Sequence, residues 1–409
     1  MRLPVFSPPL VREATSSRPR VLWLSCVAHA MHDGYTDMIY ALLPVWQSEF
    51  GLDFAALAIL RGIYAGAMAA LQLPAGWLAQ RLGSRVTLAI GTLLAALGYA
   101  IAGMSGGLIG LCVALAISGS GSSTQHPIAS GAVSRTFGRD ARGPLSLYNF
   151  SGDLGKSILP AAISVLVTMM SWRHALWIVA AMGVIVAAVL LVMFPAVPRS
   201  AATGVETEAP PAPNRGSSGS GKRGFSTLFS IGVLDTAVRM GLLTFLPFLL
   251  EAKGISPKLL GTSLALVFIG GAAGKFICGW LGARLGVVRT VLLTEGGTAV
   301  GIVALTYLPL PLAMVLLPIL GMMLNGTSSV LYGTVPELTA PDAAERAFAI
   351  FYTGTIASGA ISPVLYGFLG DGVGVQAATY ATALTALAII PLALALRPRL
   401  ANDRTERTL

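Results

Sequence analysis

Twelve apolar stretches follow one another along the chain, with short polar connections between them. A helix needs about 20 apolar residues to cross the hydrocarbon core of a bilayer, and each stretch is close to that length. The predicted spans are residues 21–46, 54–79, 86–104, 107–134, 143–170, 174–194, 225–250, 259–282, 288–308, 310–335, 344–370 and 374–396. The pattern therefore predicts an all-α integral membrane protein with twelve transmembrane helices.

The chain contains two copies of one unit, because several short motifs recur at a fixed offset of 203 residues. Leu43-Pro44, Gly76-Trp77-Leu78 and Arg81-Leu82-Gly83 return as Leu246-Pro247, Gly279-Trp280-Leu281 and Arg284-Leu285-Gly286. Duplicated membrane units are common in secondary transporters, which bind their substrate between the halves. We therefore predict two pseudo-symmetric six-helix bundles, residues 21–194 and 225–396.

One long polar stretch separates the two copies. Residues 195–224 are rich in Pro, Gly, Ser and Ala without apolar periodicity, which is typical of a flexible linker. Six passes return the chain to its starting side, so a second copy in the same orientation needs such a connection. The polar ends, residues 1–20 and 397–409, are interpreted as tails on the same side as the linker.

Composition favours a transporter over an enzyme. The chain is 55% hydrophobic and 11% charged, whereas soluble domains carry about 25% charged residues. It has no GxxxxGK[ST] phosphate-binding motif and no GxSxG nucleophile elbow between a strand and a helix. We therefore expect no cofactor, and an ion gradient or substrate gradient as the energy source.

Basic residues set the expected orientation, since Lys and Arg stay on the cytoplasmic side. With both termini cytoplasmic, the inner segments and the inner ends of the adjoining spans hold 20 of the 27 basic residues, and the outer loops hold Arg173, Lys253 and Lys258. A basic inner face meets anionic lipid headgroups, so the net charge of +9 requires no nucleic acid. The three cysteines lack metal-ligand spacing, and no metal site is predicted.

Two loops resemble the signature of the major facilitator superfamily. Gly76-x-x-x-Gln80-Arg81-x-Gly83-Ser84-Arg85 is similar to its Gly-x-x-x-Asp-Arg-x-Gly-Arg-Arg loop between helices 2 and 3, and residues 279–289 are a weaker copy. The family's acid is absent from both copies, as Gln80 and Ala283. The resemblance implies alternating access of the two halves. Expected conformational residues are Gly76, Arg81, Gly83, Arg85, Gly279, Arg284, Gly286 and, on a small-residue ridge of helix 2, Gly66.

A narrower resemblance is to the fosmidomycin-resistance family of drug exporters. It rests on His32-Asp33-Gly34-Tyr35-Thr36-Asp37, on Gly119-Ser120-Gly121-Ser122-Ser123-Thr124-Gln125-His126-Pro127 and on Gly152-Asp153-Leu154-Gly155-Lys156-Ser157-Ile158-Leu159-Pro160. Asp153 and Lys156 stand where that family has neutral polar residues, and Leu159 replaces a glycine. The resemblance implies a multi-pass protein of the bacterial inner membrane.

Ionisable residues inside predicted spans are the main functional clues, because each is costly in lipid. His29, Asp33 and Asp37 share one stripe of helix 1, and Arg61 lies at a similar depth on helix 2. A carboxylate in a low-dielectric cavity can load and release a proton; alternatively, Asp37 and Arg61 form a structural ion pair. The predicted proton-coupling residues are Asp33, Asp37, His32, His126 and Asp153.

Asp153 and Lys156 are spaced to pair along one face of helix 5. If Asp153 takes up a proton, Lys156 becomes free to bind an anion. On helix 7, Asp235 and Arg239 are expected to pair within the helix. Glu295 of helix 9 is expected to make a gating or packing contact with the arginines of the loop before it. The predicted substrate-binding residues are Lys156, Arg61, Tyr35, Asn149, Gln125, Asp235, Arg239, Asn325 and Tyr332.

Three functional hypotheses follow. The first is a proton-driven antiporter that exports a small anionic or zwitterionic compound or drug. The second is a proton symporter that imports a small organic anion. The third is a membrane receptor with this fold that transports nothing. In the first two, the partners are a small-molecule substrate, protons and the lipid bilayer, and a monomer suffices.

Overall fold

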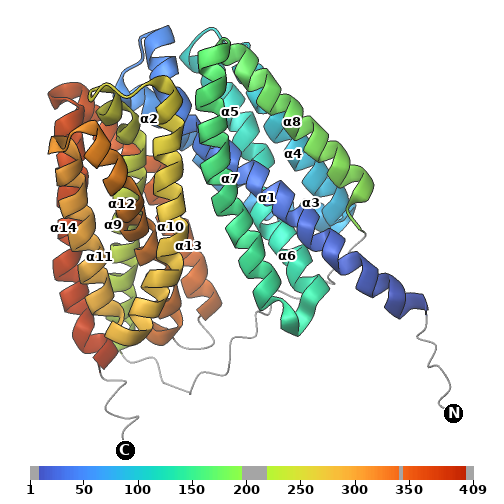
Figure 1. The fold of residues 1–409 in the computed structure, drawn as a ribbon. Helices are drawn as coiled ribbons and strands as arrows, with labels where there is room; N and C mark the ends of the chain where they lie inside the picture. The colour runs from blue at the N-terminus through green and yellow to red at the C-terminus, as the bar shows by residue number, and fades with distance from the viewer. Residues whose placement is uncertain (1–8, 196–218, 340–343, 402–409) are drawn as a thin grey trace, which may run out of the picture. The chain divides into compact units, whose positions relative to one another are not determined.

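The computed structural model describes residues 9–195, 219–339 and 344–401, and every regular element in those ranges is helical. The helices of the first half are α1 (Pro9–Phe50), α2 (Phe54–Ala70), α3 (Gln72–Leu82), α4 (Ser84–Ala102), α5 (Leu108–Ser122), α6 (Gln125–Phe137), α7 (Arg142–Met169) and α8 (Trp172–Met193). The second half contains α9 (Gly219–Glu251), α10 (Pro257–Leu285), α11 (Val287–Tyr307), α12 (Leu310–Thr334), α13 (Ala344–Val373) and α14 (Val375–Ala401). Two short 3₁₀ turns, η1 (Gly138–Asp140) and η2 (Val335–Leu338), follow α6 and α12 (Figure 1).

Each of the twelve predicted spans coincides with one helix or with one broken helix. The first and last helices are longer than predicted, because α1 already begins at Pro9 and α14 continues to Ala401. Helix α9 begins at Gly219, inside the stretch predicted as linker. The rest of that stretch, residues 196–218, lies outside the described residues.

Two predicted spans are broken. The second divides at Leu71, where α2 and α3 meet at 45°. The fourth divides at Ser123 and Thr124, between α5 and α6. Pro127 explains this second break, because proline lacks a backbone N–H and its ring clashes with the carbonyl four residues earlier.

The helices have the length and composition of membrane spans. Ten of those in the described residues are long and apolar enough to cross a bilayer, or eleven if α2 and α3 count as one span. Helix α1 accounts for the remaining predicted span, although its polar residues keep it outside that set. Large apolar side chains on α5 and α8, such as Ile109 and Val192, are exposed, as expected of side chains that contact lipid.

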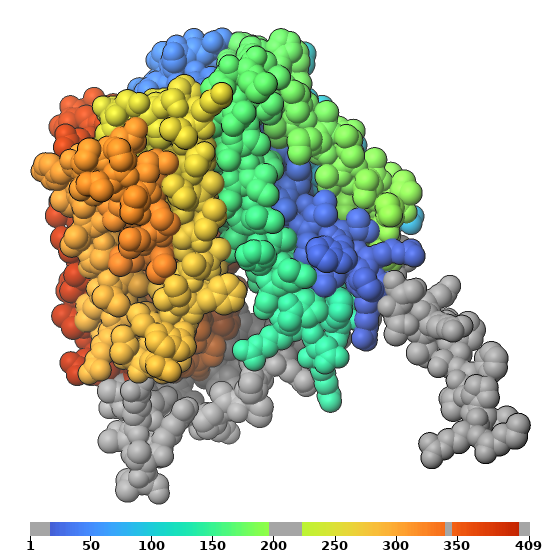
Figure 2. Space-filling model, in the orientation of Figure 1, coloured from blue at the N-terminus to red at the C-terminus, as the bar shows by residue number. Residues whose placement is uncertain are grey.

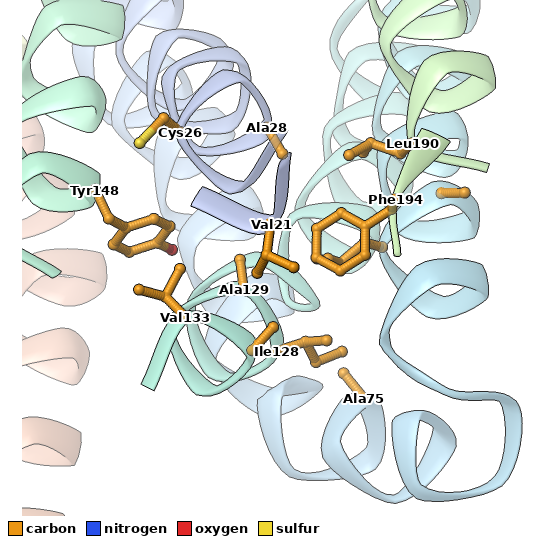
Figure 3. Packing of buried hydrophobic residues seen from close by; sticks show 13 residues of the cluster. Val21, Cys26, Ala28, Ala75, Ile128, Ala129, Val133, Tyr148, Leu190 and Phe194 are labelled. Carbon is orange, nitrogen blue, oxygen red and sulfur yellow. The ribbon is translucent and has the colours of Figure 1, made fainter. Parts of the chain in front are cut away.

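The residues group into two compact units. Unit 1 comprises the described parts of Met1–Thr36, Ala67–Leu159 and Trp172–Thr203, and unit 2 those of Asp37–Gly66, Pro160–Ser171 and Gly204–Leu409. Unit 1 has a core in which α1, α3, α4, α6, α7 and α8 meet, and Figure 3 shows Val21, Ala129 and Phe194 at its centre. Small residues such as Ala28 and Ala129 let these helices approach closely.

Unit 2 has its own core of apolar residues, in which Leu228, Val291, Leu331 and Phe351 are almost fully buried. Figure 2 shows the side chains of α10 and α11, yellow to orange, on the surface of this unit. Unit 2 also includes the end of α1 and most of α2. The Asp371 carboxylate of α13 accepts hydrogen bonds from the backbone N–H groups of Phe54 and Ala55, at 2.7 and 3.0 Å.

The repeated loops turn at equivalent glycines. Gly83 joins α3 to α4 with φ of 84°, and Gly286 joins α10 to α11 with φ of 82°. This left-handed conformation is one that glycine adopts without steric cost. Gly76 and Gly279, the first residues of the two motifs, lie inside α3 and α10, within the predicted spans 54–79 and 259–282. Arg81 and Arg85 are exposed, and Arg284 lies over the Trp280 ring at 4.3 Å.

Candidate functional site

A buried carboxylate at Asp33 is the centre of a charged cluster in unit 1. Its side chain is within 3.3 Å of His29 Nε2 and of Lys156 Nζ, and within 3.7 Å of His126 Nε2. Helix α1 supplies Asp33 and His29 one turn apart, α6 supplies His126, and α7 supplies Lys156. Asp33 is only 7% exposed. Its negative charge has lost most of its hydration and is stabilised by these neighbours instead.

The proton on His29 can be placed from its hydrogen bonds. Nδ1 lies 2.7 Å from the backbone carbonyl of Tyr148, and a carbonyl only accepts, so Nδ1 carries the hydrogen. In a neutral imidazole the other nitrogen, Nε2, is then an acceptor. It faces a carboxylate oxygen of Asp33 at 3.3 Å. Two acceptors at that distance repel, unless a proton resides on one of them.

His32 has a different environment, although it is only three residues away. The Thr92 hydroxyl donates to Leu88 O, so His32 Nε2 donates to Thr92 at 2.9 Å. Its Nδ1 then accepts from the Ser122 hydroxyl at 3.1 Å. Both ring nitrogens are satisfied in the neutral form, and the side chain is 2% exposed. The arrangement therefore favours a structural role for His32 over the predicted proton-coupling role.

Lys156 has a partner that the sequence did not reveal. The expected pair was with Asp153, which lies one turn earlier on α7 and is half-buried. The structure adds Asp33 of α1, at 3.3 Å from the ammonium group. The lysine side chain is 30% exposed, so it can reach both the buried carboxylate and a solvated ligand.

Asp37 and Arg61 form the expected ion pair in unit 2. Arg61 Nη2 lies 3.9 Å from Asp37 Oδ1, and both residues are at least nine-tenths buried. The guanidinium also lies over the rings of Tyr40 and Tyr64, at 5.4 and 5.8 Å, where it is attracted to the ring faces. These contacts favour the alternative in which Asp37 and Arg61 form a structural ion pair.

A second buried polar cluster lies in unit 2. Asp235 and Arg239 of α9 were expected to pair directly, and Ser328 of α12 connects them. The Ser328 hydroxyl donates to Asp235 Oδ2 at 3.0 Å and accepts from Arg239 Nη1 at 3.1 Å. Glu295 of α11 is hydrogen-bonded to Asp235 and to Thr327.

The remaining predicted substrate residues are dispersed. Tyr35 is fully buried, and its hydroxyl donates to Val179 O at 2.9 Å, which indicates a packing role. Asn149 is exposed on α7. Asn325 donates to Gly321 O at 3.1 Å, and the Tyr332 ring packs against Phe351.

Gln125 differs from these residues. It is fully buried, and neither side-chain polar atom has a hydrogen-bond partner among the described residues. A buried amide without partners is costly. It therefore suits a position that a polar ligand or water completes.

The Asp33 cluster also has the donor set of a metal site. Single ligand atoms of His29, Asp33 and His126 lie within 4.8 Å of one another, and two histidines with a carboxylate can bind a divalent transition metal. The Lys156 ammonium group, however, is 3.3 Å from the same carboxylate. A divalent cation would be repelled there, so the cluster is better suited to a proton.

Two features of these clusters were missed at the level of sequence. His29 was placed on the stripe with Asp33 but not among the site residues, although its i, i+4 spacing was a usable signal. Glu295 was left outside the site. The repeat offset was the available signal, because Glu295 lies 203 residues after Thr92, just as Asp235 lies 203 residues after His32.

Comparison with known proteins places this geometry in context. The family model of the Major Facilitator Superfamily matches residues 25–230 and 228–408. The probable sulfoacetate transporter SauU of Cupriavidus necator is 25% identical over 389 residues, covering 89% of this chain and 90% of that protein. The fosmidomycin resistance protein of Escherichia coli is 25% identical over 161 residues, covering 39% of this chain and 40% of that protein.

Solved structures share the fold. A bacterial homolog of the human lysosomal transporter Spinster, in an inward-facing and occupied conformation, superposes with a TM-score of 0.77 at 14% identity. That match covers 97% of this chain and 99% of the other. The nucleoside transporter NupG superposes with a TM-score of 0.76 at 15% identity, covering 92% and 99%. The predicted fold class is thereby confirmed.

Proposed function

Because the chain belongs to the major facilitator superfamily and is a multi-pass membrane transporter, we propose that it couples the movement of a small organic anion to that of protons. Asp33 is the proton-binding group and Lys156 the anion-binding group. His29, His126 and Gln125 complete the site in unit 1.

The contact between His29 and Asp33 carries this proposal. With Nδ1 committed to the Tyr148 carbonyl, the facing pair of acceptors is stable only when it holds a proton. Burial strengthens the requirement, because a low dielectric medium magnifies the repulsion between unpaired groups. A pair that takes up a proton when it closes, and releases it when it separates, is suited to proton coupling.

The proximity of Lys156 supplies the coupling to an anion. When Asp33 is ionised, it neutralises the ammonium group. When Asp33 is protonated, the cluster gains a positive charge that a substrate anion can balance. Proton and anion then favour each other's binding, and this coupling is reciprocal.

Mutual stabilisation favours symport, in which both ligands move in the same direction. Exchange by antiport would instead require the proton and the substrate to compete for the site. The antiporter that exports a drug or small anion remains the second candidate, because the Escherichia coli relative is a fosmidomycin resistance protein. The relative that spans most of the chain is a probable sulfoacetate transporter, and it supports a small organic anion as the substrate class.

The proposed setting is the bacterial inner membrane, with both termini and the segment between the halves in the cytoplasm. Basic residues gather in those segments, as the orientation rule requires. Residues 21–194 and 225–396 are the halves proposed to alternate around the substrate. Each chain contains both halves, so a monomer is sufficient.

Proteoliposomes with a pH-sensitive dye in the lumen test the proposal. Sulfoacetate is added outside without a pH gradient, while potassium and valinomycin clamp the membrane potential. Symport acidifies the lumen, and antiport makes it more alkaline. A dye response that is present in wild type and absent in Asp33→Asn supports proton coupling at Asp33.

The matched control is Asp140→Asn, which changes an exposed carboxylate in unit 1. It should respond like wild type. Equal proton fluxes in wild type and Asp33→Asn would refute the role of Asp33. A panel of other organic anions, with fosmidomycin included, distinguishes an incorrect substrate from an inactive preparation.

A further inference from the structure

Asp235 and Glu295 bring two carboxyl groups together in the interior of unit 2. Asp235 lies on α9 and Glu295 on α11, and they are 3% and 2% exposed. Each is a hydrogen-bond partner of the other. An ionised carboxylate can only accept hydrogen bonds, so a hydrogen bond between two carboxyl groups requires a proton on one of them. Carboxyl pairs of this kind share a proton, because two like charges cannot both be buried.

The surrounding charges fit a single shared proton. Arg239 reaches Asp235 through Ser328, with donor distances of 3.1 and 3.0 Å. With one proton on the carboxyl pair, the remaining negative charge balances the guanidinium. Tyr332 of α12 is the further titratable group that interacts with Asp235 and Arg239. Thr327 and Thr294, which contact each other at 2.8 Å, line the Glu295 side.

Two buried hydrogen-bonding groups on α9 and α11 have no partner among the described residues. Arg239 Nε is buried and has no hydrogen-bond partner among the described residues. The same holds for the hydroxyl of Thr298, which lies one turn beyond Glu295 on α11 and is 1% exposed. Unsatisfied buried donors are costly. Their presence beside the carboxyl pair is expected where a water or proton arrives during the working cycle.

The internal repeat shows that packing alone does not require these carboxyl groups. Asp235 lies 203 residues after His32, and Glu295 lies 203 residues after Thr92. In the first half, His32 and Thr92 contact each other at 2.9 Å as neutral groups. The same position in the second half therefore holds two ionisable groups where a neutral pair satisfies the fold.

We propose that Asp235 and Glu295 form a second proton-binding site, which exchanges its proton during the transport cycle. This inference rests on the proposed proton coupling for its role in transport, and it adds one proton to the number carried with each anion. Arg239 provides the counter-charge that makes the cluster as a whole neutral when the carboxyl pair holds one proton.

Infrared difference spectroscopy of the purified full chain in lipid nanodiscs tests the site without relying on transport. A protonated carboxyl group gives a carbonyl stretching band that shifts in deuterated water. Wild type and Asp33→Asn should both show such a band, and its intensity should change between mildly acidic and mildly alkaline pH. In the Asp33→Asn background, where Asp33 contributes no band, Glu295→Gln should lose it, because the remaining Asp235 is free to ionise beside Ser328 and Arg239.

A double variant guards against failure to fold. Asp235→His with Glu295→Thr recreates the neutral pair of the first half, and in the Asp33→Asn background it should fold and lack the band. Reversal potentials in proteoliposomes then give the ratio of protons to anions, which should fall by a single proton in Glu295→Gln. In the Asp33→Asn background, a band that is unchanged by pH, or that persists in Glu295→Gln, would overturn the second site. Loss of coupling in Asp33→Asn is scored separately, so the two proposals can fail independently.

Discussion

His29 Nε2 lies 3.3 Å from Asp33 Oδ2. In the neutral imidazole, this nitrogen has no hydrogen to donate. The Tyr148 carbonyl enforces this orientation by accepting the hydrogen of the other nitrogen. A change that turns this acceptor into a donor should therefore alter how tightly the site holds its proton.

His29→Gln places an amide where the imidazole was, and its NH₂ group can donate to Asp33. The ionised carboxylate is then stabilised without a proton, so protonation requires a higher proton concentration. The pH of half-maximal transport should move to lower pH by about one unit, equivalent to about 1.4 kcal/mol. The matched control is His174→Gln on α8, which changes an exposed histidine. A shift to higher pH in His29→Gln would contradict the assigned tautomer.

Lys156 is predicted to bind the anion directly. Lys156→Gln removes the charge that attracts the substrate and leaves Asp33 without its ammonium partner, 3.3 Å away. Anion uptake should fall at least about tenfold, equivalent to about 1.4 kcal/mol. Lys156→Arg should recover part of it, because the charge is kept while the geometry changes. Lys258→Gln, at an exposed position, should transport like wild type; full uptake by Lys156→Gln would exclude an electrostatic role.

Asp371 is predicted to hold α13 against the start of α2. Its carboxylate accepts from two backbone N–H groups there, at 2.7 and 3.0 Å, and such caps contribute about 1 kcal/mol. Asp371→Ala should lower thermal stability in detergent by about this amount. It should also increase the reactivity of a cysteine introduced at Gly370, where an added Cβ would lie 3.3 Å from the Phe54 ring.

Asp53→Ala is the control for that prediction. It removes a cap on the same helix, the 2.7 Å bond to the Ala56 N–H, but leaves the connection to α13 intact. It should lower stability without raising the reactivity at residue 370. Equal labelling of the two variants would show that the Asp371 contact merely caps α2.

The fold could be predicted from the sequence because its main determinants are local. Apolar length gave the spans, and the 203-residue offset gave the duplication. Helix breaks were harder to predict. Pro127 indicated a local opening, but the break lies at Ser123 and Thr124. Pro74, three residues after the bend at Leu71, was an unused signal of the same kind.

The site was only partly predictable, because partners on different helices depend on how those helices pack. Spacing along one helix suggested Asp153 for Lys156, while Asp33 approaches from α1. Spacing also suggested a direct pair of Asp235 with Arg239, whereas Ser328 of α12 connects them. Sequence also could not show the two hydroxyl partners of His32, which favour a structural role over the predicted proton coupling. Sequence identified most of the ionisable groups and could not assign their contacts.

Two glycines on the small-residue ridge of α2, Gly62 and Gly66, should respond differently to a bulky substitution. A side chain at Gly62 would meet the Ala360 carbonyl at 2.9 Å, whereas at Gly66 no described atom lies within 4 Å of an added Cβ. Gly62→Leu should lower thermal stability by about 1–3 kcal/mol through overpacking. Gly66→Leu should fold like wild type and yet transport more slowly, if α2 slides past other helices during the cycle. Melting temperature and initial uptake rate, measured on the same preparations, separate the two effects. Normal turnover in Gly66→Leu would mean that this part of α2 keeps its open surroundings in every state of the cycle.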